Sequence, residues 1–209
     1  ENDVVTSINE RHENEMFLEG VTLSQNVKAT TNLAEIAGSD FVFMVVPAQF
    51  VRTVVTELKD HISDNAAIVL CAKGIEQSSG KLMTEVVSEI VPKSPLVVLS
   101  GPTFAREVAQ GLPSAVTVAS KYQQVTQRLS DAIGQPTFRP YASRDIVGAE
   151  IGGALKNVFA IACGITTGRK MGDNARAALI TRSLSEMVRY GERYGAERST
   201  MIGLCGLGD

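Results

Sequence analysis

The sequence predicts an α/β protein, in which an open sheet covered by helices leads into the start of an all-helical domain. Over residues 41–141, short apolar runs alternate with amphipathic stretches of helical periodicity. Beyond residue 146 the strand signal disappears, and two long helical stretches follow. We therefore predict an α/β domain over residues 1–147 and a helical domain over residues 148–209.

The first three strands of this sheet are predicted to be parallel. Phe41–Val46 is continuously apolar, as a strand covered on both faces requires. A helical stripe follows over residues 49–58. The same succession repeats with a strand at Ala66–Cys71, a helix at Lys81–Ile90 and a strand at Leu96–Leu99. Short connections of this kind favour right-handed crossovers between parallel strands.

The remaining elements complete both domains. Two further strands are expected at residues 115–119 and 137–141, with a helix between them. The first helix of the second domain, residues 146–167, is rich in Gly and Ala, which allows close packing against a neighbour. A second helix is expected over residues 175–194.

Composition and charge exclude several classes of protein. Of 209 residues, 44% are hydrophobic and 21% are charged, a balance that excludes a disordered or collagen-like chain. The net charge of −3 does not indicate a basic surface that would bind nucleic acid. The apolar runs fall short of the ~20 residues that cross a bilayer, and no signal peptide is evident. We therefore expect a cytoplasmic protein without a transmembrane segment.

The cysteines predict neither a disulfide framework nor a metal site. Cys71, Cys163 and Cys205 are odd in number and widely spaced, and each lies in an apolar context. This usage is typical of reduced core residues in a cytosolic protein. No CxxC pair or neighbouring histidine adds a ligand pattern, so we expect no metal.

Unusual residues follow three predicted strands, at the edge where open parallel sheets bind ligands, and they are Val46–Gln49, Ala72–Gly74 and Ser100–Thr103. Lys73 comes directly after a buried strand and is either a cation for an anionic ligand or an ordinary lysine at a strand end. Gly101–Thr103 precedes a short helical stretch. Free N–H groups there would suit a phosphate or a nicotinamide amide, whereas the simpler alternative is a turn that starts a helix.

Lys156 interrupts the small-residue helix of the second domain. A lone lysine on such a helix either extends to water or is partly desolvated with a lowered pKa, which would suit general acid–base chemistry. Asn157 beside it favours the functional interpretation. Both alternatives stay open on the residues alone.

Three stretches together resemble one enzyme family, the bacterial-type NAD(P)-dependent glycerol-3-phosphate dehydrogenases. They are Leu99–Val108 (LSGPTFAREV), Glu150–Val158 (EIGGALKNV) and Ala177–Arg182 (AALITR). Supporting stretches, including Val45-Val-Pro47 and Ala72-Lys-Gly-Ile-Glu76, keep the family's order along the whole chain.

The resemblance implies a fold, a reaction and roles for particular residues. It implies a Rossmann-type domain before a helical domain, NAD or NADP as cofactor, and interconversion of sn-glycerol 3-phosphate and dihydroxyacetone phosphate, which supplies phospholipid synthesis. It also implies a homodimer when full length. The implied catalytic acid–base residue is Lys156, the substrate contacts are Lys73, Gly101, Thr103, Lys156 and Asp209, and the cofactor contacts are Lys73, Ala105 and Pro47.

The sequence departs from the family pattern in several places, so other functions stay open. The Gly-rich fingerprint is absent, and both ends look cut, so we interpret the chain as an internal segment that is inactive by itself. We expect the missing first strand to belong at the centre of the sheet, between strands that remain. Ser183 stands where the family usually has glycine. The alternatives are a non-catalytic truncated module and a related 2-hydroxyacid or ketopantoate-type reductase.

Overall fold

The computed structural model describes residues 2–208. The elements up to the third strand of the main sheet are α1 (Asn2–Arg11), β1 (Glu13–Asn14), β2 (Leu18–Thr22), the short 3₁₀ helix η1 (Leu33–Ile36), β3 (Phe41–Met44), η2 (Ala48–Phe50), α2 (Val51–Leu58), β4 (Ala67–Leu70), α3 (Met83–Ile90) and β5 (Leu96–Ser100). The later elements are α4 (Ala105–Ala109), β6 (Ser114–Ala119), α5 (Gln123–Ile133), β7 (Phe138–Ser143), α6 (Ile146–Gly168), α7 (Asp173–Arg193) and α8 (Arg198–Met201).

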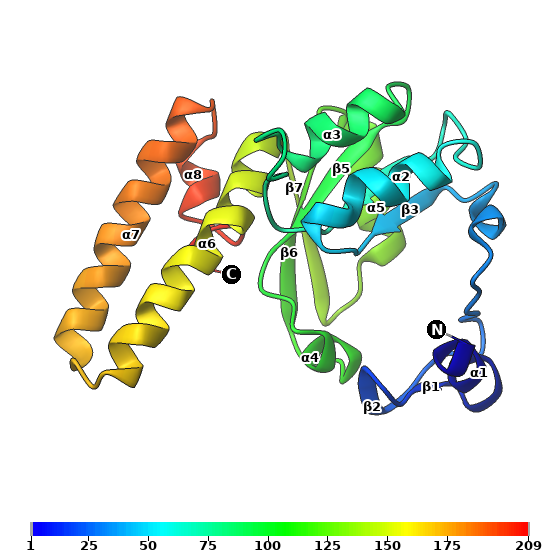
Figure 1. Cartoon of the computed structure of the whole chain (residues 1–209), viewed down its shortest axis with the longest axis horizontal. Coiled ribbons are helices and arrows are strands. Elements are labelled where there is room, and N and C mark those ends of the chain that lie inside the picture. The colour runs from blue at the N-terminus through cyan, green and yellow to red at the C-terminus, as the bar shows by residue number, and fades with distance from the viewer. Residues whose placement is uncertain (1, 209) are drawn as a thin grey trace.

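The main sheet has five described strands in the order β3-β4-β5-β6-β7, flanked by helices (Figure 1). The predicted parallel pairing of β3, β4 and β5 is confirmed. β6 pairs with β5 antiparallel and with β7 parallel, so the sheet is mixed. The long helices that follow lie to one side of the sheet, as the predicted α/β-then-helical fold class requires.

Two expectations about the sheet and its surroundings need correction. The described strands pair without a gap, so the expectation of a missing strand between them is wrong, and β3 is an edge strand. Helix α1 and the small β1–β2 hairpin were not predicted. Their residues are mostly polar and exposed, and they carry neither the alternation nor the apolar stripe on which the prediction depends.

Both faces of the sheet are covered at β4, which explains its continuous apolar run, whereas the expectation of two covered faces is wrong for β3, where Phe43 is 44% exposed at the edge of the sheet. Along β4, Ile68 and Leu70 pack on one side with α2 and α3, whereas Ala67 and Val69 pack on the other side with Leu129 of α5. All four side chains are at most 2% exposed. Because successive side chains of a strand point to opposite faces, a strand between two helical layers needs apolar residues at every position.

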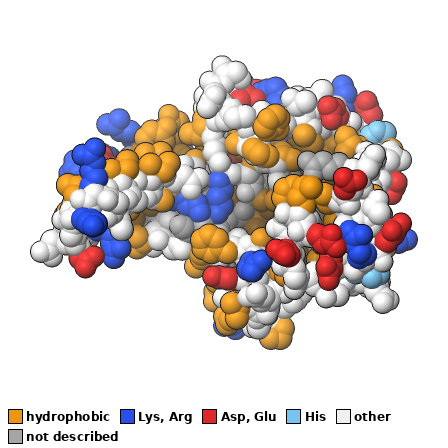
Figure 2. All heavy atoms as spheres, turned by 60° about the horizontal axis from the view of Figure 1, so that its bottom comes forward, with side chains coloured by type: hydrophobic (Ala, Val, Ile, Leu, Met, Phe, Trp, Pro, Cys, Tyr) orange, Lys and Arg blue, Asp and Glu red, His pale blue; other side chains and the backbone are white. Residues whose placement is uncertain are grey.

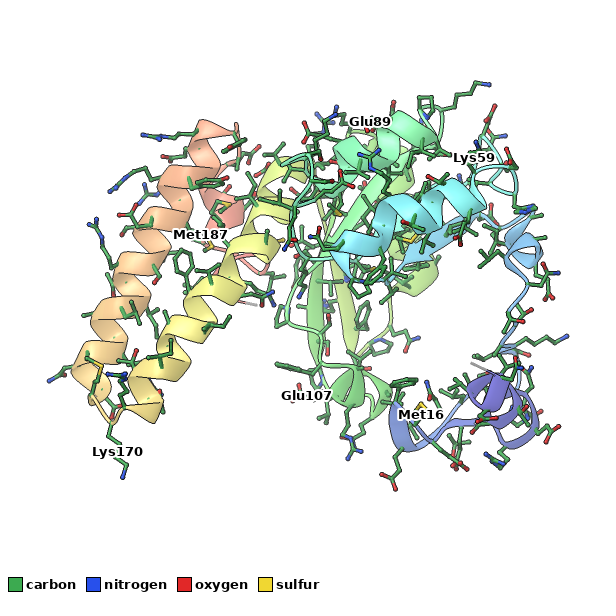
Figure 3. The ribbon with its side chains drawn as sticks, viewed as in Figure 1. Met16, Lys59, Glu89, Glu107, Lys170 and Met187 are labelled. Carbon is green, nitrogen blue, oxygen red and sulfur yellow. The ribbon has the colours of Figure 1, made fainter. Side chains whose placement is uncertain are left out.

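Helix α6 connects the two parts of the molecule. Its N-terminal half packs against the sheet through Ile146 and Ala149. Its C-terminal half forms an antiparallel pair with α7, and Met187 of α7 points into the space between them (Figure 3). The predicted boundary between residues 147 and 148 falls at the start of α6 and stays a prediction.

By length and composition, α6 is also the one helix of residues 2–208 that could cross a membrane. It carries Glu150 and Lys156, and its first half is buried against β5 and β6. These features are typical of a core helix. The expected lack of a transmembrane segment stays a prediction.

Candidate active site

The carboxyl ends of β3, β4 and β5 share one edge of the sheet because the three strands are parallel. The segments after these strands touch one another there. A methyl group at Gly74 would lie 2.9 Å from Ala48 Cβ, so the chain after β4 packs tightly on the chain after β3. Lys73 Nζ donates to the carbonyl oxygen of Gly101 at 3.4 Å, which joins the chain after β4 to the chain after β5. The sequence prediction that these strand ends form one site is consistent with this geometry.

Gly101 is the residue that lets the chain turn at the end of β5. Its φ of 152° is one that other residues rarely adopt, and a methyl group there would lie 2.9 Å from the Ala115 carbonyl oxygen. Thr103 Oγ1 donates to the same Gly101 carbonyl at 3.3 Å. The predicted substrate contacts Gly101 and Thr103 therefore lie beside Lys73.

The loop that carries Lys73 is held in place by one side chain from η2 and one from the start of α2. The Gln49 amide donates to the Ile75 carbonyl at 2.8 Å and accepts from the Gln77 N–H at 3.0 Å. Arg52 binds both carboxylate oxygens of Glu76 at 2.8 and 2.9 Å. The hydrogen bonds from Arg52 and Ser79 lower the pKa of Glu76 to about 2, so its carboxylate stays charged at neutral pH.

Helix α6 brings Lys156 to the same edge. The helix runs along β5, and a methyl group at Gly153 would lie 3.2 Å from Ser100 Oγ and 3.5 Å from Lys73 Cγ. Lys156 follows one turn later, and side chains on a helix lean toward its N-terminus, which here is the direction of Gly153 and Lys73. The helix of Lys156 therefore contacts Lys73 one turn before Lys156 itself.

Lys156 is half-buried and lines a pocket of about 230 Å³ between α6, α7 and the turn after α8. The opposite walls include Ser183, Met187 and Leu207. Ser183 is buried at 6% exposure, so the residue that departs from the family pattern faces the space beside Lys156. A second groove on the α6–α7 hairpin shares only Phe159 with this pocket and contains none of the predicted site residues.

Positive charge gathers in the hollow between the sheet and the helical pair, where Lys or Arg side chains are visible (Figure 2). Two lysines around one anionic ligand explain how a chain of net charge −3 could bind a phosphate ester. Within residues 2–208, no three His, Cys, Asp or Glu side chains lie together as a metal site would require.

Three predicted residues stand apart from this cluster. Pro47 follows β3 and is exposed. Ala105 begins the five-residue helix α4 and is also exposed. Their predicted contacts with a cofactor stay predictions. Asp209 lies outside the described residues.

None of the three cysteines of residues 2–208 forms a disulfide, and all three lie near the site, with Cys163 lining the pocket of Lys156. Cys71 follows β4, and burial raises the pKa of its thiol to about 11, although the nearby charge of Lys73 opposes the shift. Cys71 is therefore protonated at neutral pH and is not a nucleophile. Cys205 Sγ lies 3.8 Å from the Ser100 carbonyl oxygen, so it packs where α6 meets β5.

The sequence analysis overlooked Gln49 and Arg52, which bind the loop of Lys73, and Glu150, a buried carboxyl group on the helix of Lys156. Glu150 could have been found by the argument applied to Lys156, because it too is a charge on a helix of small and apolar residues. Gln49 and Arg52 gave no comparable signal, since polar residues on an amphipathic helix are usually solvated.

Two family models match nearly the whole chain. The N-terminal model of NAD-dependent glycerol-3-phosphate dehydrogenase matches residues 1–126, and the C-terminal model of the same family matches residues 145–209. The chain belongs to this family. The resemblance drawn from the three motifs is thereby confirmed.

Individual members of the family are similar along the full length of the chain. A glycerol-3-phosphate dehydrogenase [NAD(P)+] of Parvibaculum lavamentivorans is 52% identical over 209 residues, and one of Rhodospirillum rubrum is 53% identical over 210 residues. Both matches cover 100% of this chain but only 63% and 60% of those proteins. The chain thus spans about three fifths of the length of these curated relatives.

Solved structures support the same relationship. The glycerol-3-phosphate dehydrogenase of Coxiella burnetii superimposes with a TM-score of 0.94 at 38% identity, over 100% of this chain and 64% of that one. The enzyme of Saccharomyces cerevisiae gives a TM-score of 0.86 at 29% identity, over 99% and 62%. A ketopantoate reductase of Ralstonia eutropha gives a TM-score of 0.54 at 12% identity, which shows a shared fold alone.

Proposed function

We propose that this chain carries the reaction centre of an NAD(P)-dependent glycerol-3-phosphate dehydrogenase, which interconverts sn-glycerol 3-phosphate and dihydroxyacetone phosphate. The observation that carries the proposal is the convergence of Lys73 and the helix of Lys156, where Gly153 passes Lys73 and Ser100. Family membership and the printed names of the relatives support the choice of substrate.

In this reaction Lys156 acts as the general acid in the direction of ketone reduction. Its ammonium group donates a proton to the oxygen that becomes an alkoxide, and its charge stabilises that oxygen beforehand. A positive charge that is already in place where negative charge develops lowers the activation barrier by roughly several kcal/mol. In the reverse direction the neutral amine accepts the proton of the substrate hydroxyl.

Lys73 binds the substrate as a second cation and holds it against Lys156. The Gln49 and Arg52 contacts fix the loop of Lys73, so its charge is positioned before the substrate arrives. The Thr103 hydroxyl and the chain at Gly101 contact the substrate beside it. From the resemblance alone, we assign Asp209 to orient Lys156 or to bind the substrate hydroxyl.

A nicotinamide cofactor supplies the hydride. The residues present fit its nicotinamide end, because Lys73, Pro47 and Ala105 lie at or after the carboxyl ends of parallel strands. The sequence contains no Gly-x-Gly-x-x-Gly turn, so these residues account for that end of the cofactor only. They do not distinguish NAD from NADP.

The wider setting follows the resemblance. We assign residues 1–147 to cofactor binding and residues 148–209 to the helical substrate domain, in a cytoplasmic homodimer that supplies glycerol 3-phosphate for phospholipid synthesis. No contact with nucleic acid or membrane is part of this assignment.

The test is a substrate comparison with the complete protein. Oxidation of NADH and of NADPH is followed by ultraviolet absorbance with dihydroxyacetone phosphate, with ketopantoate and with 2-keto acids. Turnover of dihydroxyacetone phosphate with at least one cofactor is expected. Turnover of ketopantoate or a keto acid instead would favour the related reductase, and binding without turnover of any substrate would favour a non-catalytic module.

A further inference from the structure

Glu150 is a buried carboxyl group that the proposed reaction does not use. It lies on α6 six residues before Lys156, and only 6% of its surface is exposed. Its neighbours on the helix include Ala149, Ile151 and Gly152, all of them buried. A charged residue in such surroundings is costly unless its oxygens are hydrogen-bonded.

Thr84, on a different helix, satisfies both oxygens of this carboxyl group. Glu150 Oε1 accepts from the Thr84 N–H at 2.9 Å, and Glu150 Oε2 accepts from the Thr84 hydroxyl at 2.5 Å. Thr84 lies in the first turn of α3, where an N–H group has no partner within its own helix. Glu150 therefore caps α3 from α6, across 66 residues of sequence.

The start of α3 is also the end of the loop that carries Lys73. Ile75 pairs with Leu82, and the Glu76 N–H donates to the Lys81 carbonyl at 2.9 Å, so the chain from Lys73 to α3 closes into one compact loop. Through Thr84, Glu150 thus ties the helix of one active-site lysine to the loop of the other.

We propose that Glu150 is a positioning residue, whose two hydrogen bonds to Thr84 hold the helix of Lys156 in register with the loop of Lys73. This inference rests on the proposed function for its catalytic consequence. Six residues of helix place the contact ~9 Å along the axis from Lys156. The close approach at Gly153 lies between them, so α6 also contacts Ser100 and Lys73 between Glu150 and Lys156.

The hydrogen bonds, rather than a full negative charge, are what this role requires. Burial raises the pKa of Glu150 to about 7, and the neighbouring Glu85 carboxylate adds to the shift, while the bonds from Thr84 oppose it. Glutamine can reproduce both bonds, because its amide oxygen accepts the Thr84 N–H and its amide nitrogen can donate to the Thr84 hydroxyl. Leucine has a similar volume and can make neither bond.

The experiment compares Glu150→Leu, Glu150→Gln and Thr84→Val in the complete protein. Thr126→Val is the matched control, since Thr126 is 2% exposed and its hydroxyl donates to the Gln123 carbonyl within α5, on the other face of the sheet. Misplacing a reacting group by about 1 Å can cost about 100-fold in rate. We expect Glu150→Leu and Thr84→Val to lower kcat about 10- to 100-fold.

The KM for dihydroxyacetone phosphate should change less than about threefold in these two variants, because the Gln49 and Arg52 contacts still hold Lys73. Glu150→Gln and Thr126→Val should keep kcat within about threefold of the wild type. An unchanged kcat in Glu150→Leu, or a loss in Glu150→Gln as large as in Glu150→Leu, would overturn the proposal. If Glu150→Leu does not fold, the kcat of Thr84→Val is compared with that of the Thr126→Val control, and equal values would overturn the proposal.

A readout without turnover separates this inference from the proposed function. A short amine-reactive cross-linker joins lysines that are close, and peptide mass spectrometry gives the yield of the Lys73–Lys156 link. The yield should fall in Glu150→Leu and persist in Glu150→Gln. If the wild type does not reduce dihydroxyacetone phosphate, the proposed function fails, and the cross-link yields alone support or overturn the positioning role.

Discussion

Gly153 of α6 lies directly against Ser100 at the end of β5. A methyl group on Gly153 would lie 3.2 Å from the Ser100 hydroxyl oxygen, which is itself buried and without a hydrogen-bond partner among the described residues. One position earlier, a methyl group on Gly152 would lie 2.8 Å from the Cys205 carbonyl oxygen. The two glycines let the helix of Lys156 approach the strand end and the turn after α8 at backbone distance.

Substitution of Gly152 should therefore destabilise the fold. Alanine in a helix normally gains about 1 kcal/mol over glycine, but here its methyl group meets a backbone atom that must move. We expect Gly152→Ala to lower the free energy of unfolding by about 1–3 kcal/mol, as measured by urea denaturation. Gly164, on the same helix, has nothing within 4 Å of its added methyl group. Gly164→Ala should stabilise by about 0.5–1 kcal/mol, and equal effects at the two positions would contradict the packing described.

Removing the charge of Lys73 should weaken binding of the phosphate ester. Lys73→Met removes the charge but leaves an unbranched side chain only one atom shorter, so we expect a higher KM for dihydroxyacetone phosphate and a lower kcat, by about tenfold or more in kcat/KM. The matched control is Lys59→Met, because Lys59 is an exposed lysine on the outer side of the same domain (Figure 3). If both variants have the KM and kcat of the wild type in steady-state kinetics, Lys73 is an ordinary lysine at a strand end.

Glu150 should make stability depend on pH in a defined window. Its pKa is about 7 in the folded protein and 4.5 in the reference state, so between these values the folded chain holds a proton that the unfolded chain has lost. Stability should then fall as pH rises through this window, by up to about 1.4 kcal/mol per pH unit, and level off above it. Glu150→Gln should remove this slope.

Urea denaturation of both proteins at about pH 5, 6, 7 and 8 measures the difference. The advantage of Glu150→Gln over the wild type should grow up to about pH 7 and then stay constant. Parallel pH profiles would mean that Glu150 ionises at its ordinary value in the fold.

The sequence was sufficient for the main sheet and the long helices because their signals are strong and local. β4 is apolar at every position, and α6 and α7 each extend over more than twenty residues. Helix α1 and the β1–β2 hairpin escaped prediction because their residues are mostly exposed and carry little apolar pattern. The antiparallel pairing of β6 with β5 depends on tertiary contacts, and the sequence of neither strand indicates it.

The sequence singled out the residues of the candidate site, whose roles stay predictions, but not the side chains that hold them. Lys73 and Lys156 stand out because each is a charge in apolar surroundings. The approach of the Lys156 helix to Lys73 depends on Gly153 packing against Ser100, which no sequence spacing reveals. The hydrogen bonds from Gln49 to the loop after β4 are equally invisible, since an exposed glutamine on a helix is ordinary.

The kcat of a Lys156→Met variant in the complete protein tests the central claim most directly. If Lys156 transfers the proton to the substrate oxygen, kcat for reduction of dihydroxyacetone phosphate should fall by about 10² to 10⁴, the range for a positioned general acid. Affinity for the cofactor, measured by calorimetric titration, should change little. A variant that keeps more than about a third of the wild-type kcat would contradict the assignment of Lys156 as the catalytic acid.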